Sequence, residues 1–384
     1  MKKIITVIYL SCLAISSFAQ TDAQKLDSAK KLIAKEQFLS AYKFVVAIET
    51  PSPEMLHTLA VILLDPSTGT TKLLDRFAIH DKNGQYDEAE LPLESFLLAG
   101  IKMYPDNCQL YKDLSLAYNK LLSQEDLYTP LEDLQLVERA ILKTPQVKCP
   151  DYMSNYIIGY CRNYLGRSDS ALPYLQRSIA LNKNFAPAFY ELANANLRTK
   201  NFQAAITYAK QAYSLFPENK RMDKSRAVEL IGSAYEGLND NTNALAYYLR
   251  ADSIARYDFF HQKAILSFYV KTGNPKAEDA LDAFVGAVGR TNLHYYADVI
   301  QIYRKYNRTG DLADYCDKRI DQFSNRPEVQ AALYFTKAVI SPGISTAKQH
   351  FAKAKSLGLK TDGYQPKRNH PDTRKMIDDV LSLK

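Results

Sequence analysis

The sequence contains no tryptophan, and it has only 14 glycines among its 384 residues. Glycine therefore occurs at about half its usual frequency, which predicts regular secondary structure over most of the chain. Strict alternation of apolar and polar residues is scarce, and this argues against half-buried strands. Apolar residues instead recur at steps of three and four, as in residues 152–164 and 201–216. We therefore predict an all-α fold with a large core, since 46% of the residues are hydrophobic.

Motifs of common catalytic sites are also missing. The six histidines are scattered, and no two have the four-residue spacing of a zinc hydrolase helix. The sequence has no glycine-rich phosphate loop followed by Lys-Ser or Lys-Thr, and no Gly-x-Ser-x-Gly elbow. We therefore expect no enzyme activity, no metal and no cofactor, although repeats can assemble a site across helices that a linear motif does not reveal.

One string resembles a calcium-binding loop of the EF-hand type, whose oxygen ligands alternate along a tight turn. Residues 81–90 begin with Asp81, but Tyr86 takes the place of the required glycine and Pro92 that of the final glutamate. Asn83-Gly84 is by itself a strong turn dipeptide. We therefore expect a surface loop that joins two helices, and not a calcium site.

The first 19 residues have the features of a secretory signal peptide. Lys2 and Lys3 precede an apolar stretch, residues 4–18, that is shorter than the ~20 residues needed to span a bilayer. The stretch ends in the small-x-small pattern read by signal peptidase. We expect cleavage after Ala19 and export to the periplasm or outer surface of a Gram-negative cell. A membrane anchor and a lipoprotein acylated at Cys12 are the alternatives.

Four cysteines follow the expected cleavage point, and in an exported protein they could form disulfides in three complete pairings. Cys108 and Cys149 each follow a proline-containing turn sequence, which predicts that both lie in turns between repeats along one edge. A bridge between these two residues is one interpretation, and buried free thiols are the other. The remaining cysteines are Cys161 and Cys316.

The formal net charge is +7, and basic residues are concentrated near the C-terminus. Residues 341–384 contain nine Lys or Arg and four Asp. Because these charges are spread over the whole segment, we expect a solvated terminal cap. Peripheral contact with an anionic membrane surface, a glycan or an acidic protein is the alternative. We expect no nucleic-acid partner.

A pattern of mostly small residues recurs with a period of 34. Helices whose axes are about 8–10 Å apart need small residues where they cross, so the pattern indicates stacked helix pairs. A third copy contains Gly232 and Ala244 and follows a 39-residue step, which places an insertion near residues 218–224, expected as a loop. The 34-residue matches are Gly159 with Ala193, Ala171 with Ala205, Ser178 with Ala212, and Lys183 with Pro217.

These copies resemble tetratricopeptide repeats, whose helix pairs each need a neighbour to bury an apolar face. The resemblance implies a right-handed α-solenoid of roughly nine stacked antiparallel helix pairs. Well-matched repeats span 151–258, and degenerate helical repeats are expected at 20–150 and 259–362. Residues 363–384 are expected to form a basic cap or tail, with a short helix at 373–383.

The resemblance also implies that the first helix of each pair lines a concave groove. Tyrosine is abundant, with 27 residues, and it offers a large flat contact area with a polar tip. Two sets of polar and aromatic residues, one repeat apart, share nearly the same face of successive first helices. We predict that they bind an extended peptide or a helix; packing between repeats is the alternative for the tyrosines. The predicted groove residues are Tyr156, Tyr160, Asn163, Tyr190, Asn194 and Arg198.

The sequence thus favours a non-enzymatic scaffold or adaptor for protein–protein interactions in the cell envelope. Two alternatives stay open. A carbohydrate-binding accessory or envelope enzyme is one, because tyrosine-lined grooves also stack sugars. A structural subunit of a secretion or envelope-assembly complex is the other. Acidic residues beside the tyrosines would favour a glycan, whereas Asn163, Asn194 and Arg198 favour a peptide.

Overall fold

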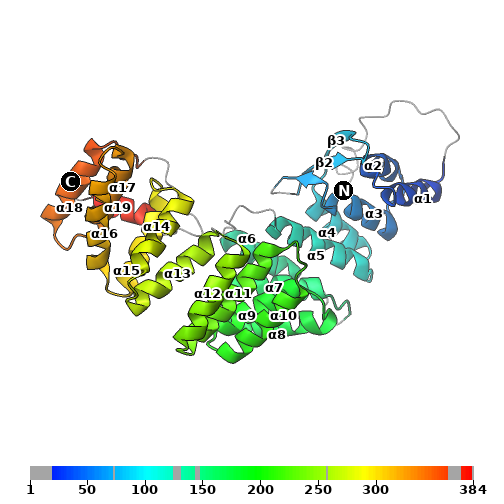
Figure 1. Cartoon of the computed structure of the whole chain (residues 1–384). Coiled ribbons are helices and arrows are strands. Elements are labelled where there is room, and N and C mark those ends of the chain that lie inside the picture. Colours follow the sequence, from blue (N-terminus) through cyan, green and yellow to red (C-terminus); the bar gives the residue numbers. More distant parts are fainter. Residues whose placement is uncertain are drawn as a thin grey trace. The chain divides into compact units, whose positions relative to one another are not determined.

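The computed structural model describes residues 20–71, 74–123, 131–142, 148–256, 258–361 and 373–382. Across these residues the chain is mostly helical, and consecutive helices pack against one another in repeated pairs (Figure 1). The predicted class, a helical solenoid of stacked pairs, is therefore confirmed. One small three-stranded sheet interrupts the helices, and the sequence analysis missed it.

The chain folds as two compact units. The first contains the sheet and the helices up to Leu165, together with Ala180–Asn182. The second contains Gly166–Ile179 and the helices that follow Lys183. The division therefore falls inside the first of the three well-matched repeats, between its two helices.

The first unit opens with helices that carry clear start signals. Thr21 and Gln24 form a reciprocal capping box, and Ser52 accepts from the Met55 amide just before a proline at the first helical position. The helices are α1 (Asp22–Ile33), α2 (Phe38–Val46), α3 (Pro53–Leu64), α4 (Leu93–Met103), α5 (Cys108–Ser123), α6 (Leu131–Ile141) and α7 (Tyr152–Tyr164).

The sheet lies between α3 and α4 in the chain. Its strands β1 (Gly69–Thr70), β2 (Arg76–His80) and β3 (Tyr86–Glu90) pair antiparallel in that order. Asn83-Gly84 forms the turn between β2 and β3, and Gly84 has the positive φ of 84° that such turns favour. The prediction of a loop joining two helices at residues 81–90 is therefore wrong, because the turn joins two strands.

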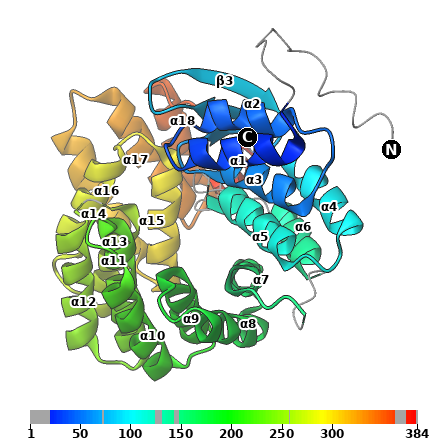
Figure 2. The same cartoon turned by 90° about the vertical axis from the view of Figure 1, so that its right-hand side faces the viewer.

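Asp81, the first residue of the calcium-loop-like string, caps a helix from a distance. Its Oδ1 accepts from the backbone amides of Leu39 at 2.8 Å and Ser40 at 3.3 Å, and its Oδ2 accepts from the Ser40 hydroxyl at 2.7 Å. The residue before α2, Gln37, forms no side-chain cap of its own. The hairpin of β2 and β3 lies beside α2 in Figure 2. Through Asp81 it provides an acceptor for the first amides of α2, which have no acceptor in the helix itself.

Cys108 and Cys149 form a disulfide, with their Cα atoms 5.2 Å apart. The bond joins the first residue of α5 to the segment that precedes α7, within the first unit. Of the two interpretations left open by the sequence, the structure therefore has the bridge. Cys161 and Cys316 are buried and form no disulfide.

In the second unit, the first helices of successive pairs form one layer, since α9, α11, α13, α15 and α17 contact one another in turn. The second helices pack against this layer (Figure 1). The helices are α8 (Ser168–Leu181), α9 (Ala186–Arg198), α10 (Phe202–Leu215), α11 (Arg221–Gly237), α12 (Asn241–Ile254), α13 (Phe259–Thr272), α14 (Ala277–Val288), α15 (Leu293–Lys305), α16 (Thr309–Gln322), α17 (Pro327–Ile340), α18 (Ile344–Ser356) and α19 (Thr373–Leu381).

The small residues of the 34-residue period are buried where helices cross. Ala193 and Ala205, from the two helices of one pair, belong to the same apolar cluster as Ile231 of the next repeat. A larger side chain at such a crossing would push the helix axes apart. The members with no exposed surface are Ala171, Ser178, Ala193, Ala205, Ala212, Ala244 and Ala251.

The insertion before the third copy lengthens a helix. α11 has 17 residues whereas α9 has 13, and the additional residues precede Gly232, the counterpart of Ala193. Four of the five inserted residues form an additional first turn of α11, residues 221–224, and the fifth lengthens the link before it. The prediction of an inserted loop near residues 218–224 is therefore wrong.

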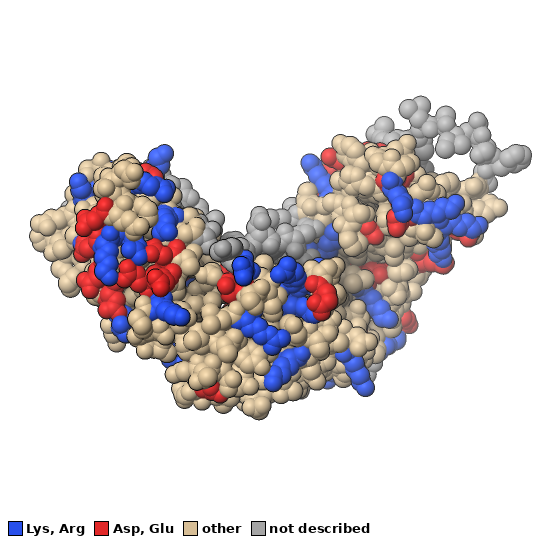
Figure 3. Space-filling view, viewed as in Figure 1, with Lys and Arg blue, Asp and Glu red and all other residues tan. Residues whose placement is uncertain are grey.

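Charged side chains on the C-terminal helices are extensively paired. Asp282 on α14 forms an ion pair with Arg319 and accepts from Tyr315 at 2.9 Å and Arg290 at 3.2 Å. Although burial opposes it, this set of hydrogen bonds holds the pKa of Asp282 below its usual value. Figure 3 shows the resulting interleaving of acidic and basic side chains at the left of the view, where α14 and α16 lie.

Several predictions fall on parts of the chain that the structure does not describe. Residues 1–19, with the predicted signal peptide, lie outside the described residues, as does most of the basic segment 363–384. The short helix predicted within that segment is confirmed as α19. Among the helices described, none is long and apolar enough to cross a membrane.

The close approach at Gly232 gives a first prediction. A methyl group there would lie 2.8 Å from the Tyr248 ring and 3.2 Å from the Ala244 carbonyl oxygen. The ring cannot retreat easily, because it is buried and its hydroxyl donates to Glu236 at 2.7 Å. Gly232→Ala should therefore lower the free energy of unfolding by about 1–3 kcal/mol, although alanine is the better helix former.

Gly286, inside α14, is the matched control for this prediction. A methyl group there meets only the flexible end of Arg290, at 3.5 Å. Gly286→Ala should leave stability unchanged or raise it by up to about 1 kcal/mol in urea unfolding. If both substitutions change the free energy of unfolding equally, the close contact between Gly232 and the Tyr248 ring does not limit the side chain at this position.

The disulfide gives a second prediction. It closes a loop of 41 residues, for which the chain-entropy relation gives about 4 kcal/mol of stabilisation. Reduction, or the double substitution of Cys108 and Cys149 by serine, should destabilise the first unit by up to that amount in urea unfolding. The double variant should no longer respond to reductant. An unfolding midpoint that reductant leaves unchanged in the native sequence would refute the bridge.

Candidate functional site

The tyrosines of α7 form a ladder along one side of the helix. The ring centroids of Tyr156 and Tyr160 are 6.1 Å apart, and those of Tyr160 and Tyr164 are 4.5 Å apart. All three rings are half-buried, so part of each is accessible. Asn163 differs from the prediction, because its side chain is fully buried and does not present an open surface to a ligand.

On α9, Tyr190 is half-buried and packs against the cluster that contains Ala186, Ala212 and Ala227. Ala227 belongs to α11, so Tyr190 lies toward the next first helix. Burial raises the pKa of Tyr190 well above its usual value, and the nearby negative charges of Glu191 and Glu229 add to this effect. The phenol therefore stays protonated and can donate a hydrogen bond at any physiological pH.

The polar residues predicted on α9 are joined to one another. Arg198 Nε donates to Asn194 Oδ1 at 3.3 Å, and Asn194 Nδ2 donates to Glu191 Oε2 at 3.4 Å. Arg198 is exposed, Asn194 is half-buried and Glu191 is buried. The three residues therefore form a ladder from the interior to the surface, with the guanidinium at its accessible end.

The predicted groove residues thus fall into two sets. Tyr156, Tyr160 and Asn163 belong to the first unit, whereas Tyr190 and its neighbours on α9 belong to the second. Each set lies on one helix, as its spacing predicted. A single groove that contains both sets remains a prediction.

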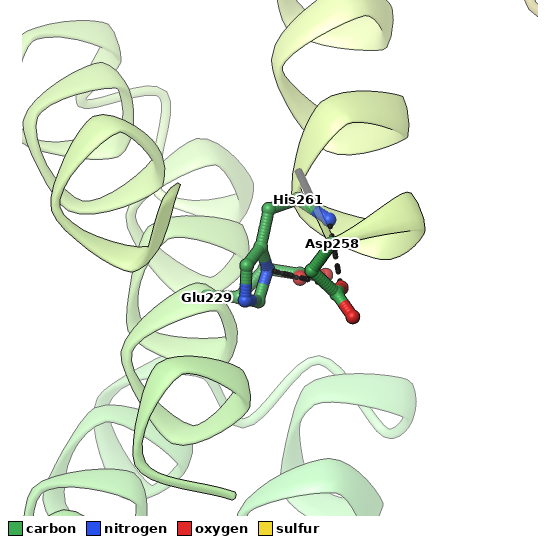
Figure 4. Close-up of side chains that lie close together, drawn as sticks. All are labelled: Glu229, Asp258 and His261. Atoms are coloured by element: carbon green, nitrogen blue, oxygen red, sulfur yellow. Dashed lines mark hydrogen bonds and ion pairs between the residues drawn. The ribbon is translucent and has the colours of Figure 1, made fainter. Parts of the chain in front are cut away.

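A second group of polar residues, which the sequence analysis did not predict, lies between α11 and α13. His261 Nδ1 is 2.5 Å from Glu229 Oε2 and 3.8 Å from Asp258 Oδ1. In Figure 4, the His261 ring projects from the start of α13 toward Glu229 on α11. His261 is buried, Asp258 is 9% exposed and the Glu229 side chain is 22% exposed. We call these three residues the His261 cluster.

The local sequence positions two members of this cluster. Asp258 is the N-cap of α13, and its Oδ1 accepts from the amides of Phe260 at 3.0 Å and His261 at 3.3 Å. His261 is three residues further on, in the first turn, so its ring projects close to the capping carboxylate. Glu229 reaches the same point from the neighbouring repeat.

Ser225 on α11 holds the other side of the imidazole. His261 Nε2 is 2.8 Å from Ser225 Oγ, and the Ser225 hydroxyl donates to the Met222 carbonyl at 2.8 Å. Serine, histidine and glutamate thus occur in the order of a hydrolase triad. Ser225, however, is fully buried, so a substrate carbonyl has no access to its oxygen. The arrangement joins two repeats and does not expose a nucleophile.

Arg226, next to Ser225, adds a cation to the same layer of helices. Its guanidinium lies 5.2 Å from the centroid of the Phe260 ring. Its Nε is buried without a hydrogen-bond partner among the described residues. The positive charge of Arg226 also acts on Tyr190, where it opposes the rise in pKa.

Sequence reasoning missed the His261 cluster for a definite reason. Glu229 and His261 are 32 residues apart and meet only because α11 and α13 stack. The single local signal is the Asp-x-x-His step from Asp258 to His261, which is common at the starts of helices. Metal and catalytic motifs read along one helix do not detect ligands supplied by successive repeats.

Comparison with protein-family models gives two matches, both described as tetratricopeptide repeats. One covers residues 164–220 and the other covers residues 225–258. Together they include α8, α9, α10, α12 and all of α11 except residues 221–224, and the 34-residue pattern is clearest there. None of the curated proteins compared with the chain matches it.

Solved structures with similar folds cover parts of the chain. MamA is 22% identical over 41% of this chain and 88% of its own, with a TM-score of 0.34. PilF of Pseudomonas aeruginosa is 13% identical over 58% and 95%, with a TM-score of 0.40. YrrB, described as a TPR protein with an unusual peptide-binding site, is 15% identical over 55% and 97%, with a TM-score of 0.35. At these scores the similarities carry no argument about function.

The role of Ser225 gives a third prediction. Ser225→Ala removes the partner of the buried His261 Nε2 and should cost about 1–3 kcal/mol of stability. Ser214 on α10 is the matched control, because its hydroxyl also donates to a carbonyl three residues back, at 2.8 Å, but is exposed. Ser214→Ala should change stability by less than about 0.5 kcal/mol. Thermal and urea unfolding measure the stability of both variants. If the two variants are equally stable, the hydroxyl of Ser225 does not stabilise His261.

Proposed function

The chain is a tetratricopeptide-repeat protein, and we propose that it is a non-enzymatic scaffold that binds a peptide or helix of a protein partner along its first helices. The supporting observation is the layer formed by α9, α11 and α13. Successive repeats place an aromatic residue and two arginines on this layer: Tyr190 and Arg198 on α9, and Arg226 on α11. We call these three residues the Tyr190 face.

The chemistry of the Tyr190 face suits a peptide. Arg198 is exposed and Arg226 is half-buried. Guanidinium groups donate to the carbonyls and carboxylates that a peptide carries. Tyr190 adds a rigid ring with a protonated hydroxyl. Arginine and tyrosine are the residue types that most often dominate the energy of such contacts.

The acidic residues nearby do not favour a glycan. Sugar recognition in a tyrosine-lined groove would need carboxylates that are free to accept from hydroxyl groups. Glu191 is 3% exposed, and the Glu229 carboxylate contacts His261 at 2.5 Å. Both carboxylates are therefore engaged within the protein, and the peptide hypothesis is the better supported one.

Export to the cell envelope is part of this proposal. The disulfide between Cys108 and Cys149 supports it, because such bonds persist in oxidising compartments and are rare in the cytosol. The signal peptide predicted to end at Ala19 also favours export to the envelope. Fractionation of cells, with mass measurement of the mature chain, tests both statements at once.

The binding proposal gives a fourth prediction. Affinity purification with the mature chain from envelope extracts should recover a partner, whose affinity is then measured with purified components. Tyr190→Ala and Arg198→Glu should each weaken that affinity by about tenfold or more, as for central interface residues. A stable complex that survives purification would indicate a structural subunit of an assembly.

Two residues on α8, a second helix, provide matched controls. Tyr174 is half-buried like Tyr190, and Arg177 is exposed like Arg198. Tyr174→Ala and Arg177→Glu should leave the affinity unchanged, and circular dichroism should show that all four variants are folded. If the α8 variants weaken binding as much as the α9 variants, the partner does not use the first helices.

A further inference from the structure

We propose that the His261 cluster is a binding site for a divalent transition-metal ion, with Zn²⁺ as the representative ion. The ligands are His261 Nδ1 and one carboxylate oxygen each from Glu229 and Asp258. These three ligand atoms all lie within 4.8 Å of one another. The site connects α11 with α13, and it is independent of the peptide-binding proposal.

The hydrogen bonds of the imidazole carry the argument. Ser225 has one hydroxyl proton, and that proton is donated to the Met222 carbonyl. Ser225 Oγ therefore accepts from His261, so Nε2 carries the ring proton. In the neutral imidazole the lone pair of Nδ1 then faces Glu229 Oε2 at 2.5 Å. Two acceptors at this distance repel each other unless a proton or a metal ion lies between them.

The surroundings match those of a histidine that ligates a metal. Such a histidine almost always donates its second ring N–H to a fixed acceptor, which sets the tautomer and the ring orientation. Ser225 is that acceptor here, and the Met222 carbonyl fixes Ser225 in turn. Asp258 is also held in place, because its Oδ1 accepts from the amides of Phe260 and His261.

Glu229 is the adjustable ligand. A tetrahedral zinc ion with bonds of about 2.0–2.2 Å requires ligand atoms about 3.3 Å apart. The Nδ1 atom of His261 is 3.8 Å from Asp258 and 2.5 Å from Glu229, so Glu229 has to move outward by somewhat less than 1 Å. Its side chain is 22% exposed, which gives it this freedom. The same exposed side admits water as the fourth ligand.

The donor set selects the class of metal. One imidazole with two carboxylates suits zinc and similar first-row ions, whereas calcium and magnesium prefer oxygen ligands alone. Three protein ligands from two repeats would join α11 to α13 more firmly than the present hydrogen bonds. Binding should therefore stabilise the second unit by mass action.

The test is metal titration of the full mature chain after treatment with a chelator. Isothermal titration calorimetry with zinc chloride should show one site, and zinc should raise the temperature of unfolding. Glu229→Gln and His261→Gln each remove one ligand and should weaken zinc binding by more than about tenfold, while Ser225→Ala should weaken it by about tenfold. Cobalt added in place of zinc should give visible d–d absorption that Glu229→Gln abolishes.

His57 provides the matched control. Its Nδ1 lies 3.0 Å from both oxygens of Asp113, so it is a histidine with one carboxylate instead of two. His57→Gln should leave the zinc affinity and the cobalt spectrum unchanged, and calcium should not compete. Glu229→Gln retains the size of the side chain, so it keeps the test valid if His261→Gln does not fold.

The proposal is overturned if zinc gives no single-site isotherm, or if Glu229→Gln binds zinc as tightly as the native protein. In that case a proton on Nδ1, and not a metal, lies between His261 and Glu229. Neither result bears on the peptide-binding proposal, because the Tyr190 face shares no residue with the His261 cluster.

Discussion

The structure depends on how closely neighbouring helices approach one another. A helix pair of this kind cannot bury its apolar face alone, so stability comes from stacking, and stacking requires small residues at the crossings. Ala193 and Ala205 provide such a crossing within one pair, and Gly232 meets the ring of Tyr248 within the next. Because the requirement recurs in each repeat, it leaves a period in the sequence. It also brings first helices side by side, which creates both candidate sites of the second unit.

Features that depend on local rules were predictable from the sequence. Apolar spacing predicted α7 to the residue and α10 to within one residue at each end, since each buries one face. The proline-containing turns predicted that Cys108 and Cys149 lie at one edge, and the disulfide confirms this. On α9, helical spacing alone indicated that Tyr190, Asn194 and Arg198 share a face, and the hydrogen bond from Arg198 to Asn194 agrees with it.

Features that depend on contacts between distant segments were not predictable. Asp81 is read locally as part of a turn, but its carboxylate caps α2, more than 40 residues earlier in the chain. The sheet was missed because β2 alternates over only five residues, too few for the pattern to be distinguished from a helix segment. Asn163 has the spacing of a surface residue, and only the packed structure shows its burial. Glu229 and His261 meet through stacking, which no spacing within one helix encodes.

The irregularity in the repeat pattern and the unpredicted cluster have a common cause. An insertion between repeats was expected to form a loop, because loops accommodate additional residues at little cost. Instead, four inserted residues form a first turn of α11, and this turn contains Met222. The Met222 carbonyl accepts the hydroxyl proton of Ser225, so Ser225 Oγ accepts from His261 Nε2. The Nδ1 atom of His261 then faces Glu229. With the regular 34-residue spacing, the residue three positions before Ser225 would lie in the link before the helix, as Lys183 does before α9. The departure from the period therefore marks the place where the scaffold acquires chemistry that a regular stack of helix pairs does not have.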